Sequence, residues 1–112
     1  MLSNLFQRVA TIDVSDAARR LEAGEIVLVD VREAGEWQSG HVPNARHIPL
    51  ATLPDVIDAL ARHGKPIAFI CGSGHRSRMA CATARGHDVE TALNVDGGMR
   101  AWQSAGLPTT RP

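Results

Sequence analysis

One short segment combines the residue types needed for thiolate chemistry. Cys71 follows an aliphatic run, and the next five residues include two glycines and Arg76. Glycine lets the backbone curl so that several N–H groups point at one centre, where they can bind an anion. A helix start and Arg76 would add positive potential there. Since such surroundings favour the thiolate, we predict a reactive nucleophile at Cys71 rather than a buried core cysteine.

The residues after Cys71 are predicted to bind the sulfur and an anionic substrate. The binding loop consists of Gly72, Ser73, Gly74, His75, Arg76 and Ser77. We expect its backbone N–H groups to surround the transferred atom. His75 either tunes the choice of acceptor or is a solvated loop residue. Cys81 lies among alanines in an expected helix, so core packing is favoured over a resolving role.

Two aliphatic runs are the expected central strands that position this loop. Residues 26–31 and 66–70 are almost unbroken apolar segments, which is typical of strands buried on both faces. Shorter strands are expected near 10–12, 45–48 and 93–95. Cys71 directly follows the second run, and Asp30 and Arg32 lie at the end of the first. Because sites form beyond the carboxyl ends of parallel strands, these residues are expected at one edge.

Helices are predicted between the strands. Ser15 is the expected N-cap of a helix over 16–23, and Thr52 that of a helix over 53–63. The second helix has an apolar stripe of Leu53, Val56, Ile57 and Leu60. Further helices are expected over 76–85 and 99–105. The alternation predicts an α/β domain with a mostly parallel five-stranded sheet and helices on both faces.

The motifs around these elements resemble the rhodanese family over nearly the whole chain. The loop fits that family's C-x-x-G-x-R-S pattern. Further matches are residues 29–33 (VDVRE), 36–37 (EW), 40–45 (GHVPNA), 47–50 (HIPL), 94–99 (NVDGGM), 101–102 (AW) and 106–108 (GLP). The resemblance implies one rhodanese-like domain over 1–112, with a core at about 9–108. It also implies a mostly architectural role for Asp30 and Arg32, although added positive potential from Arg32 is an alternative.

The resemblance implies a thiosulfate sulfurtransferase that works through a Cys71 persulfide. The sulfur donor would be a small molecule, and the acceptor cyanide, a thiol or a protein. No metal or organic cofactor is expected, and His41 and His47 lack the companion ligands of a metal site. One alternative is a regulatory, sulfide-sensing or protein-binding module. Another is a phosphatase or arsenate reductase, but Arg76 gives C-x4-R where those relatives have C-x5-R.

Composition restricts the partners and the compartment. Twelve basic and twelve acidic residues give a formal net charge of zero, so nucleic-acid and membrane-surface binding are not expected. The first ten residues lack the apolar run of a secretory signal, and two cysteines make no disulfide framework. We therefore expect a reduced, cytoplasmic protein that is a monomer or a weak dimer.

Overall fold

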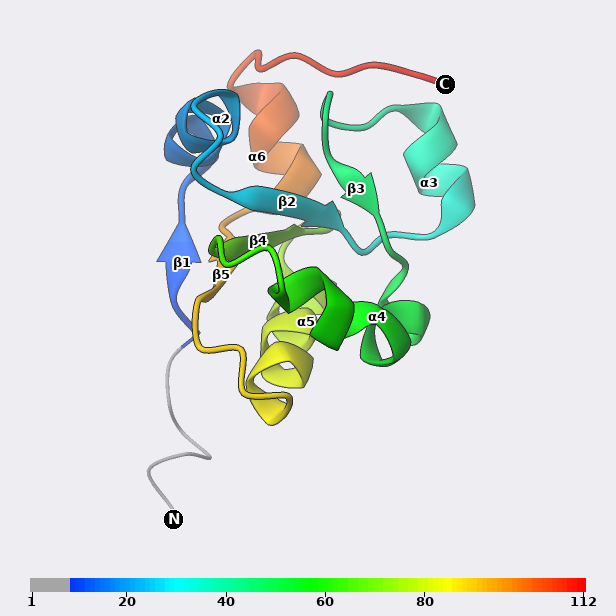
Figure 1. The fold of residues 1–112 in the computed structure, drawn as a ribbon. Coiled ribbons are helices and arrows are strands. Elements are labelled where there is room, and N and C mark those ends of the chain that lie inside the picture. Colours follow the sequence, from blue (N-terminus) through cyan, green and yellow to red (C-terminus); the bar gives the residue numbers. More distant parts are fainter. Residues whose placement is uncertain (1–8) are drawn as a thin grey trace.

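The computed structural model describes residues 9–112 and forms a parallel five-stranded sheet between two helical layers (Figure 1). The strand order is β1-β5-β4-β2-β3, and every strand pair is parallel. The strands are β1 (Thr11–Ile12), β2 (Val27–Asp30), β3 (Arg46–His47), β4 (Ile67–Ile70) and β5 (Ala92–Val95). The predicted α/β class, the five strands and the helices on both faces are confirmed. Residues 1–8, which carry the expectation about a secretory signal, lie outside the described residues.

Helices from different parts of the chain cover the two faces. The helices of the described residues are α2 (Val14–Glu22), α3 (Ala34–Ser39), α4 (Leu53–Ala61), α5 (His75–Gly86) and α6 (Gly98–Ser104), with a 3-10 turn η1 (Leu50–Thr52). Helix α3 contributes no residue to either core. Buried residues of α4 and α5 form one core with Val29 and Phe69. Buried residues of α2 and α6 form the other core with Leu28 and Ile70. Every residue of β2 and β4 is buried, which agrees with their unbroken apolar sequences.

Of the two predicted N-caps, Ser15 is wrong, whereas Thr52 is confirmed as the N-cap residue but makes no capping hydrogen bond through its side chain. The first helix begins earlier than expected, because the Asp13 carboxylate accepts the Asp16 N–H at 2.7 Å and caps it instead of Ser15. Thr52 does precede its helix, but its hydroxyl donates to the Pro49 carbonyl at 2.9 Å. The turn η1 runs directly into α4, so no extended residue is available to cap that helix.

Two further features differ from the sequence-based expectations. Val56 was expected on the buried stripe of α4, but 37% of it is exposed while Leu53, Ile57 and Leu60 are buried. Helix α3 was not predicted from the sequence. It contains no buried residue and therefore shows no apolar periodicity. Its start is held by the Glu33 N–H, which donates to the Glu36 carboxylate at 3.0 Å.

Candidate active site

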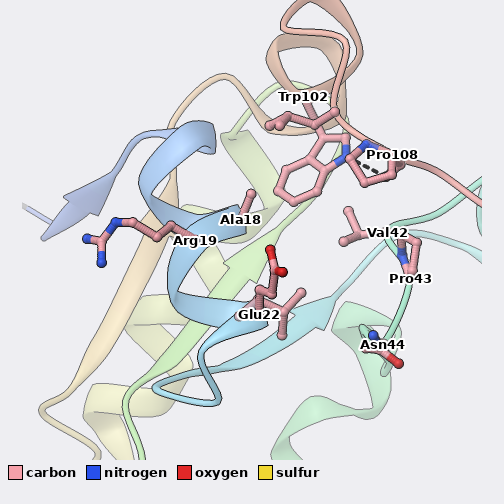
Figure 2. A pocket seen from close by; sticks show the side chains of 10 residues that line it. Ala18, Arg19, Glu22, Val42, Pro43, Asn44, Trp102 and Pro108 are labelled. Carbon is pink, nitrogen blue, oxygen red and sulfur yellow. Dashed lines mark hydrogen bonds between the residues drawn. The ribbon is translucent and has the colours of Figure 1, made fainter.

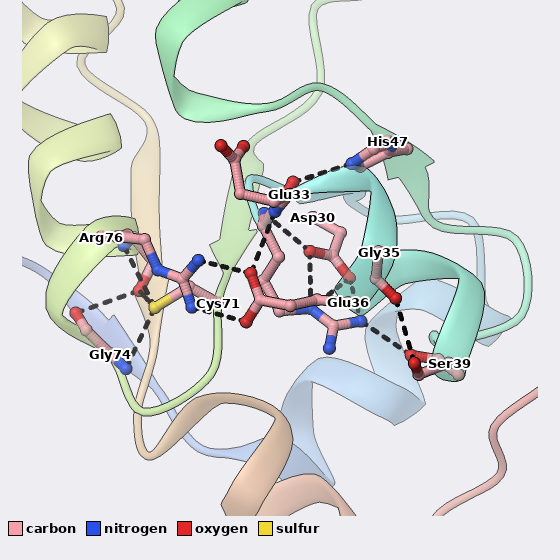
Figure 3. Close-up of polar contacts among 12 residues, drawn as sticks. Asp30, Glu33, Gly35, Glu36, Ser39, His47, Cys71, Gly74 and Arg76 are labelled. Carbon is pink, nitrogen blue, oxygen red and sulfur yellow. Dashed lines mark hydrogen bonds and ion pairs between the residues drawn. The ribbon is translucent and has the colours of Figure 1, made fainter.

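Cys71 lies where β4 ends and the loop into α5 begins (Figure 3). Its sulfur accepts the backbone N–H of Gly74 at 3.1 Å and that of Ser77 at 3.3 Å. Gly74 has a φ of +115°, a conformation that costs glycine little and other residues much more. This curl lets both N–H groups reach one sulfur. The side chain is buried, with only 1% of Cys71 exposed.

Two opposing effects act on the Cys71 thiol. Burial raises its pKa, because a buried thiolate loses its solvation. Hydrogen bonds from the Ser77 hydroxyl and from the N–H groups of Ser77, Gly74 and Ser73 lower it by more. The net result is a pKa below the ordinary value of 9.0. The loop thus favours negative charge on this sulfur at a site with little access to water.

The start of α6 fixes the loop from the opposite side. Met99 donates its N–H to the Cys71 carbonyl at 2.8 Å, and Arg100 donates to the Gly72 carbonyl at 3.0 Å. Gly98 lies against these carbonyls at a φ of +56°, where a Cβ would collide with the Cys71 oxygen and come within 2.8 Å of the Gly72 oxygen. The glycine pair at the start of α6 therefore forms a tight turn that lets two backbones approach.

Arg76 is paired with a residue far away in the sequence. Its two terminal nitrogens contact the two oxygens of Glu36 at 2.6 and 2.9 Å. Glu36 comes from α3, so the pair joins α3 to the first turn of α5 (Figure 3). The hydrogen bonds from Arg76 lower the pKa of Glu36 to about 2, and Glu36 raises the pKa of Arg76. The positive charge expected beside Cys71 is therefore largely neutralised.

Asp30 and Arg32 form a separate buried ion pair. The Arg32 guanidinium contacts both oxygens of Asp30 at 2.9–3.1 Å and donates to the Gly40 carbonyl at 2.7 Å. Asp30 is fully buried and Arg32 is 7% exposed. These contacts tie the end of β2 to the segment after α3. The architectural role is thus the one that the geometry favours.

Aromatic stacking holds α3 against the following segment. The centroid of the Trp37 ring lies 3.5 Å from the ring centroid of His41 and 4.8 Å from that of His47, and both pairs of rings are stacked. His41 Nδ1 is 2.8 Å from the Trp37 carbonyl, and His47 Nε2 is 2.8 Å from the Arg32 carbonyl. Both histidines therefore link backbone segments.

Cys81 is buried like Cys71, but its thiol lies in a different environment. It is fully buried in the α4–α5 core, and burial raises the pKa of its thiol to about 11. Both cysteines are free thiols. The interpretation of Cys81 as a core residue therefore agrees with its surroundings.

Two site residues were missed by the sequence reasoning. Glu36 was noted only as part of a motif, although its spacing from Glu33 is that of a helix-capping acidic residue. Asn94 is a polar residue inside an otherwise apolar strand, and its side chain accepts the Ser77 hydroxyl proton. Buried polar residues need partners, so this position was a signal in the sequence.

A cavity of about 300 Å³ lies away from the Cys71 loop (Figure 2). Ala18 and Glu22 of α2 face Trp102 of α6 across it, and Val42 and Pro108 complete its wall. The lining is largely apolar and contains no residue of the loop from 71 to 77.

Within residues 9–112, no helix has the length and apolar character needed to cross a membrane.

Comparison with known families identifies the class of this protein. The model of the family described as Rhodanese-like domain matches residues 13–105, so the chain belongs to that family. Thiosulfate sulfurtransferase GlpE of Pseudomonas savastanoi is 35% identical over 89 residues, which cover 80% of this chain and 83% of that protein. An HTH-type transcriptional regulator of Mycobacterium tuberculosis is 37% identical over 97 residues. These cover 84% of this chain but only 42% of the regulator.

Solved structures show the same fold. A rhodanese-related protein from Thermoplasma volcanium matches 92% of this chain and 99% of its own, with a TM-score of 0.81 and 27% identity. A Rhodopseudomonas palustris protein, described as of unknown function and a possible tyrosine phosphatase, has a TM-score of 0.84 and 27% identity. That match covers 91% of this chain and 85% of the other. The fold therefore occurs with names from more than one activity class.

Proposed function

We propose that this chain is a thiosulfate sulfurtransferase that carries the transferred sulfur on Cys71. The observation that carries the proposal is the pair of N–H donors at the Cys71 sulfur, at 3.1 and 3.3 Å, beyond the end of a buried strand. Similarity to a protein named thiosulfate sulfurtransferase supports the choice of donor. No metal or organic cofactor takes part in the proposed reaction.

In the first half-reaction, the Cys71 thiolate attacks the outer sulfur of thiosulfate. A new S–S bond forms to Cys71, the S–S bond of thiosulfate breaks, and its electron pair leaves with sulfite. Cys71 then carries a persulfide with one negative charge. The donors from Gly74 and Ser77 stabilise the negative charge of the Cys71 sulfur before it attacks, as preorganised dipoles do in other covalent mechanisms.

In the second half-reaction, a nucleophile takes the outer sulfur from the persulfide. With cyanide as acceptor, a C–S bond forms, thiocyanate leaves and the electron pair of the broken S–S bond returns to the Cys71 thiolate. A thiol or a protein is the alternative acceptor in a cell. Since donor and acceptor react in turn with one sulfur, ping-pong kinetics are expected.

Access to the sulfur requires a movement. Only 1% of Cys71 is exposed, and Arg76 Nη2 lies 3.2 Å from where a Cβ of Gly72 would stand. The guanidinium therefore covers part of the loop while it is bound to Glu36. An anionic sulfur donor can compete with the Glu36 carboxylate for the Arg76 guanidinium. Binding of the donor to Arg76 would release the contact with Glu36, uncover the loop and bring the donor toward Cys71.

The decisive experiment is intact-mass analysis after treatment with thiosulfate. We expect a gain of one sulfur atom in the wild-type chain and in Cys81→Ser, and none in Cys71→Ser. Thiocyanate formation should follow the same order, with Cys81→Ser retaining more than about a tenth of wild-type activity, a barrier change below about 1.4 kcal/mol. A folded Cys71→Ser protein that still made thiocyanate would refute the proposal.

Phosphate chemistry is the competing proposal that the name of one structural relative raises. Donors that converge on one sulfur do not also surround three phosphoryl oxygens, and catalysis requires donors where charge develops. We expect no release of nitrophenol from its phosphate ester by the wild-type chain. Inserting one residue between Cys71 and Arg76 should abolish sulfur transfer. Efficient ester hydrolysis without thiocyanate formation would reverse the assignment.

A sensing or binding module is the second alternative, and it is favoured by one relative. The regulator that shares 37% identity is more than twice as long as the matched region, so there the domain accompanies other segments. In a sensor, Cys71 would become modified by a sulfur donor but would pass the sulfur on slowly. Measuring both half-reactions separates this role from catalysis.

A further inference from the structure

Asn94 is a buried polar side chain in the middle of β5. It pairs in register with Phe69 of β4 and Thr11 of β1, and only 1% of it is exposed. Burying an amide costs free energy unless its donors and acceptor find partners. An apolar residue of similar size would avoid that cost. The hydrogen-bond partners of the Asn94 amide therefore indicate what this residue does at the site.

The Asn94 oxygen contacts the Ser77 hydroxyl, which is itself next to the Cys71 sulfur. Ser77 is fully buried, and its Oγ is 3.4 Å from the sulfur and 3.1 Å from the Gly74 carbonyl. A serine hydroxyl has one proton to donate and two lone pairs that accept. Asn94, Gly74 and a negatively charged Cys71 sulfur therefore compete for a single proton.

The best arrangement of these groups depends on the charge of the sulfur. With a thiol, the Cys71 S–H donates to Ser77, and Ser77 donates to the Asn94 oxygen. With a thiolate, the Ser77 proton is needed at the sulfur, and the Asn94 oxygen would face a lone pair. Rotating the amide by half a turn exchanges its oxygen for its NH2 group, which donates to Ser77.

We propose that Asn94 is a positioning residue that directs the Ser77 hydroxyl proton and turns its NH2 group toward Ser77 when the Cys71 sulfur is negatively charged. The proposal rests on the proposed function only in taking a charged Cys71 sulfur as the reacting species. The ionisable side chains around the site are His75 and Arg76 of α5, Glu36 of α3, Asp30 at the end of β2, Arg32 after it, and Arg100 of α6. None of these is altered in the variants below.

The test replaces the amide by a carboxylate, which can only accept. In Asn94→Asp, the carboxylate would hold the Ser77 proton away from the sulfur. The midpoint of the pH profile for Cys71 alkylation should then rise by about one to two pKa units, the loss of one hydrogen bond to a charged group. In a Ser77→Ala background, Asn94→Asp should raise the midpoint much less, because only the added charge acts. Equal rises in both backgrounds, or no rise, would overturn the proposal.

A second measurement keeps Asn94 in place, because a buried carboxylate can prevent folding. The NMR resonances of the Asn94 side-chain amide are followed while Cys71 is titrated. They should shift at the Cys71 midpoint in the wild-type protein and much less in Ser77→Ala, where charge changes but the link is cut. Equal shifts would contradict the proposal. Neither measurement uses a sulfur donor, so failure of the mass experiment above would refute sulfur transfer without affecting this result.

Discussion

The Cys71 sulfur accepts hydrogen bonds from backbone N–H groups, while the guanidinium of Arg76 is already paired with Glu36. Ser77, Gly74 and Ser73 supply the hydrogen bonds that lower the pKa of the thiol. Arg76 was expected to supply a fixed positive charge, but Glu36 binds it through both oxygens. The electrostatic effect of Arg76 on Cys71 must therefore be considered together with that of Glu36.

Single and paired substitutions separate these charges. Arg76→Gln leaves the Glu36 carboxylate unpaired near the sulfur, so the pKa of Cys71 should rise. Glu36→Gln frees Arg76, so that pKa should fall. The double variant should lie near the wild type, because the pair is almost neutral. Each single change should alter the alkylation rate of Cys71 at about pH 7 by roughly threefold to tenfold, in opposite directions.

Arg76→Lys is the control for this series. Lysine keeps the positive charge but lacks the planar guanidinium. Arg76→Lys should therefore restore only part of the Cys71 alkylation rate that Arg76→Gln loses. An identical pH profile for Arg76→Gln and the wild type would show that the ion pair has no electrostatic role at Cys71.

At the scale of elements, the close backbone contact between the start of α6 and the Cys71 loop fixes the position of that loop. In Gly98→Ala, the new Cβ would collide with backbone oxygen of Cys71 and Gly72 at a positive φ. Backbone cannot move aside as a flexible side chain can. We expect a loss of about 2–4 kcal/mol of stability and more than tenfold in thiocyanate formation.

Gly24→Ala is the matched control. Gly24 also has a positive φ, of +73°, but nothing lies within 4 Å of its Cβ position. This variant should lose about 1–2 kcal/mol from backbone conformation and keep its activity. Urea unfolding and an activity assay on both variants decide the question. Equal effects would show that the contact with Cys71 is unimportant.

The elements also show what the sequence could and could not predict. The strands of apolar residues were predictable, because burial restricts the residue types. Helix α3 was not, because none of its residues is buried. The Glu36–Arg76 contact was equally out of reach. It joins residues 40 positions apart, and nothing local in the sequence indicates which carboxylate a given arginine will meet.

For the whole molecule, the same ion pair predicts how stability depends on pH. The pKa of Glu36 is lowered from 4.5 to about 2 in the folded chain. A lowered carboxyl pKa contributes stability above the unfolded value, and this contribution is lost as pH falls from 4.5 toward 2. Both side chains are more than one-third exposed, at 34% and 38%, so solvent screening reduces the effect. We expect at most about 1 kcal/mol.

Thermal unfolding of the wild type and Glu36→Gln tests this expectation. Near about pH 6, the wild type should melt higher, by up to about 8 °C for a domain of this size. The difference should shrink as the pH is lowered through the window between the two pKa values. A constant difference across that window would mean that Glu36 stabilises the fold by packing rather than by charge.

The short outer strands have a consequence for how copies of this domain behave toward one another. In the described part of the chain, the sheet ends at β1 and β3, each of which is two residues long. An unpaired strand edge is a template to which a strand of another chain can add, and the tendency to aggregate in this way grows with the length of the edge. Here a second molecule would find only a few backbone groups on either side. The more apolar strands β2 and β4, of four residues each, lie inside the sheet, where β4 pairs with β2 and β5 and β2 pairs with β4 and, at Val29 and Asp30, with β3.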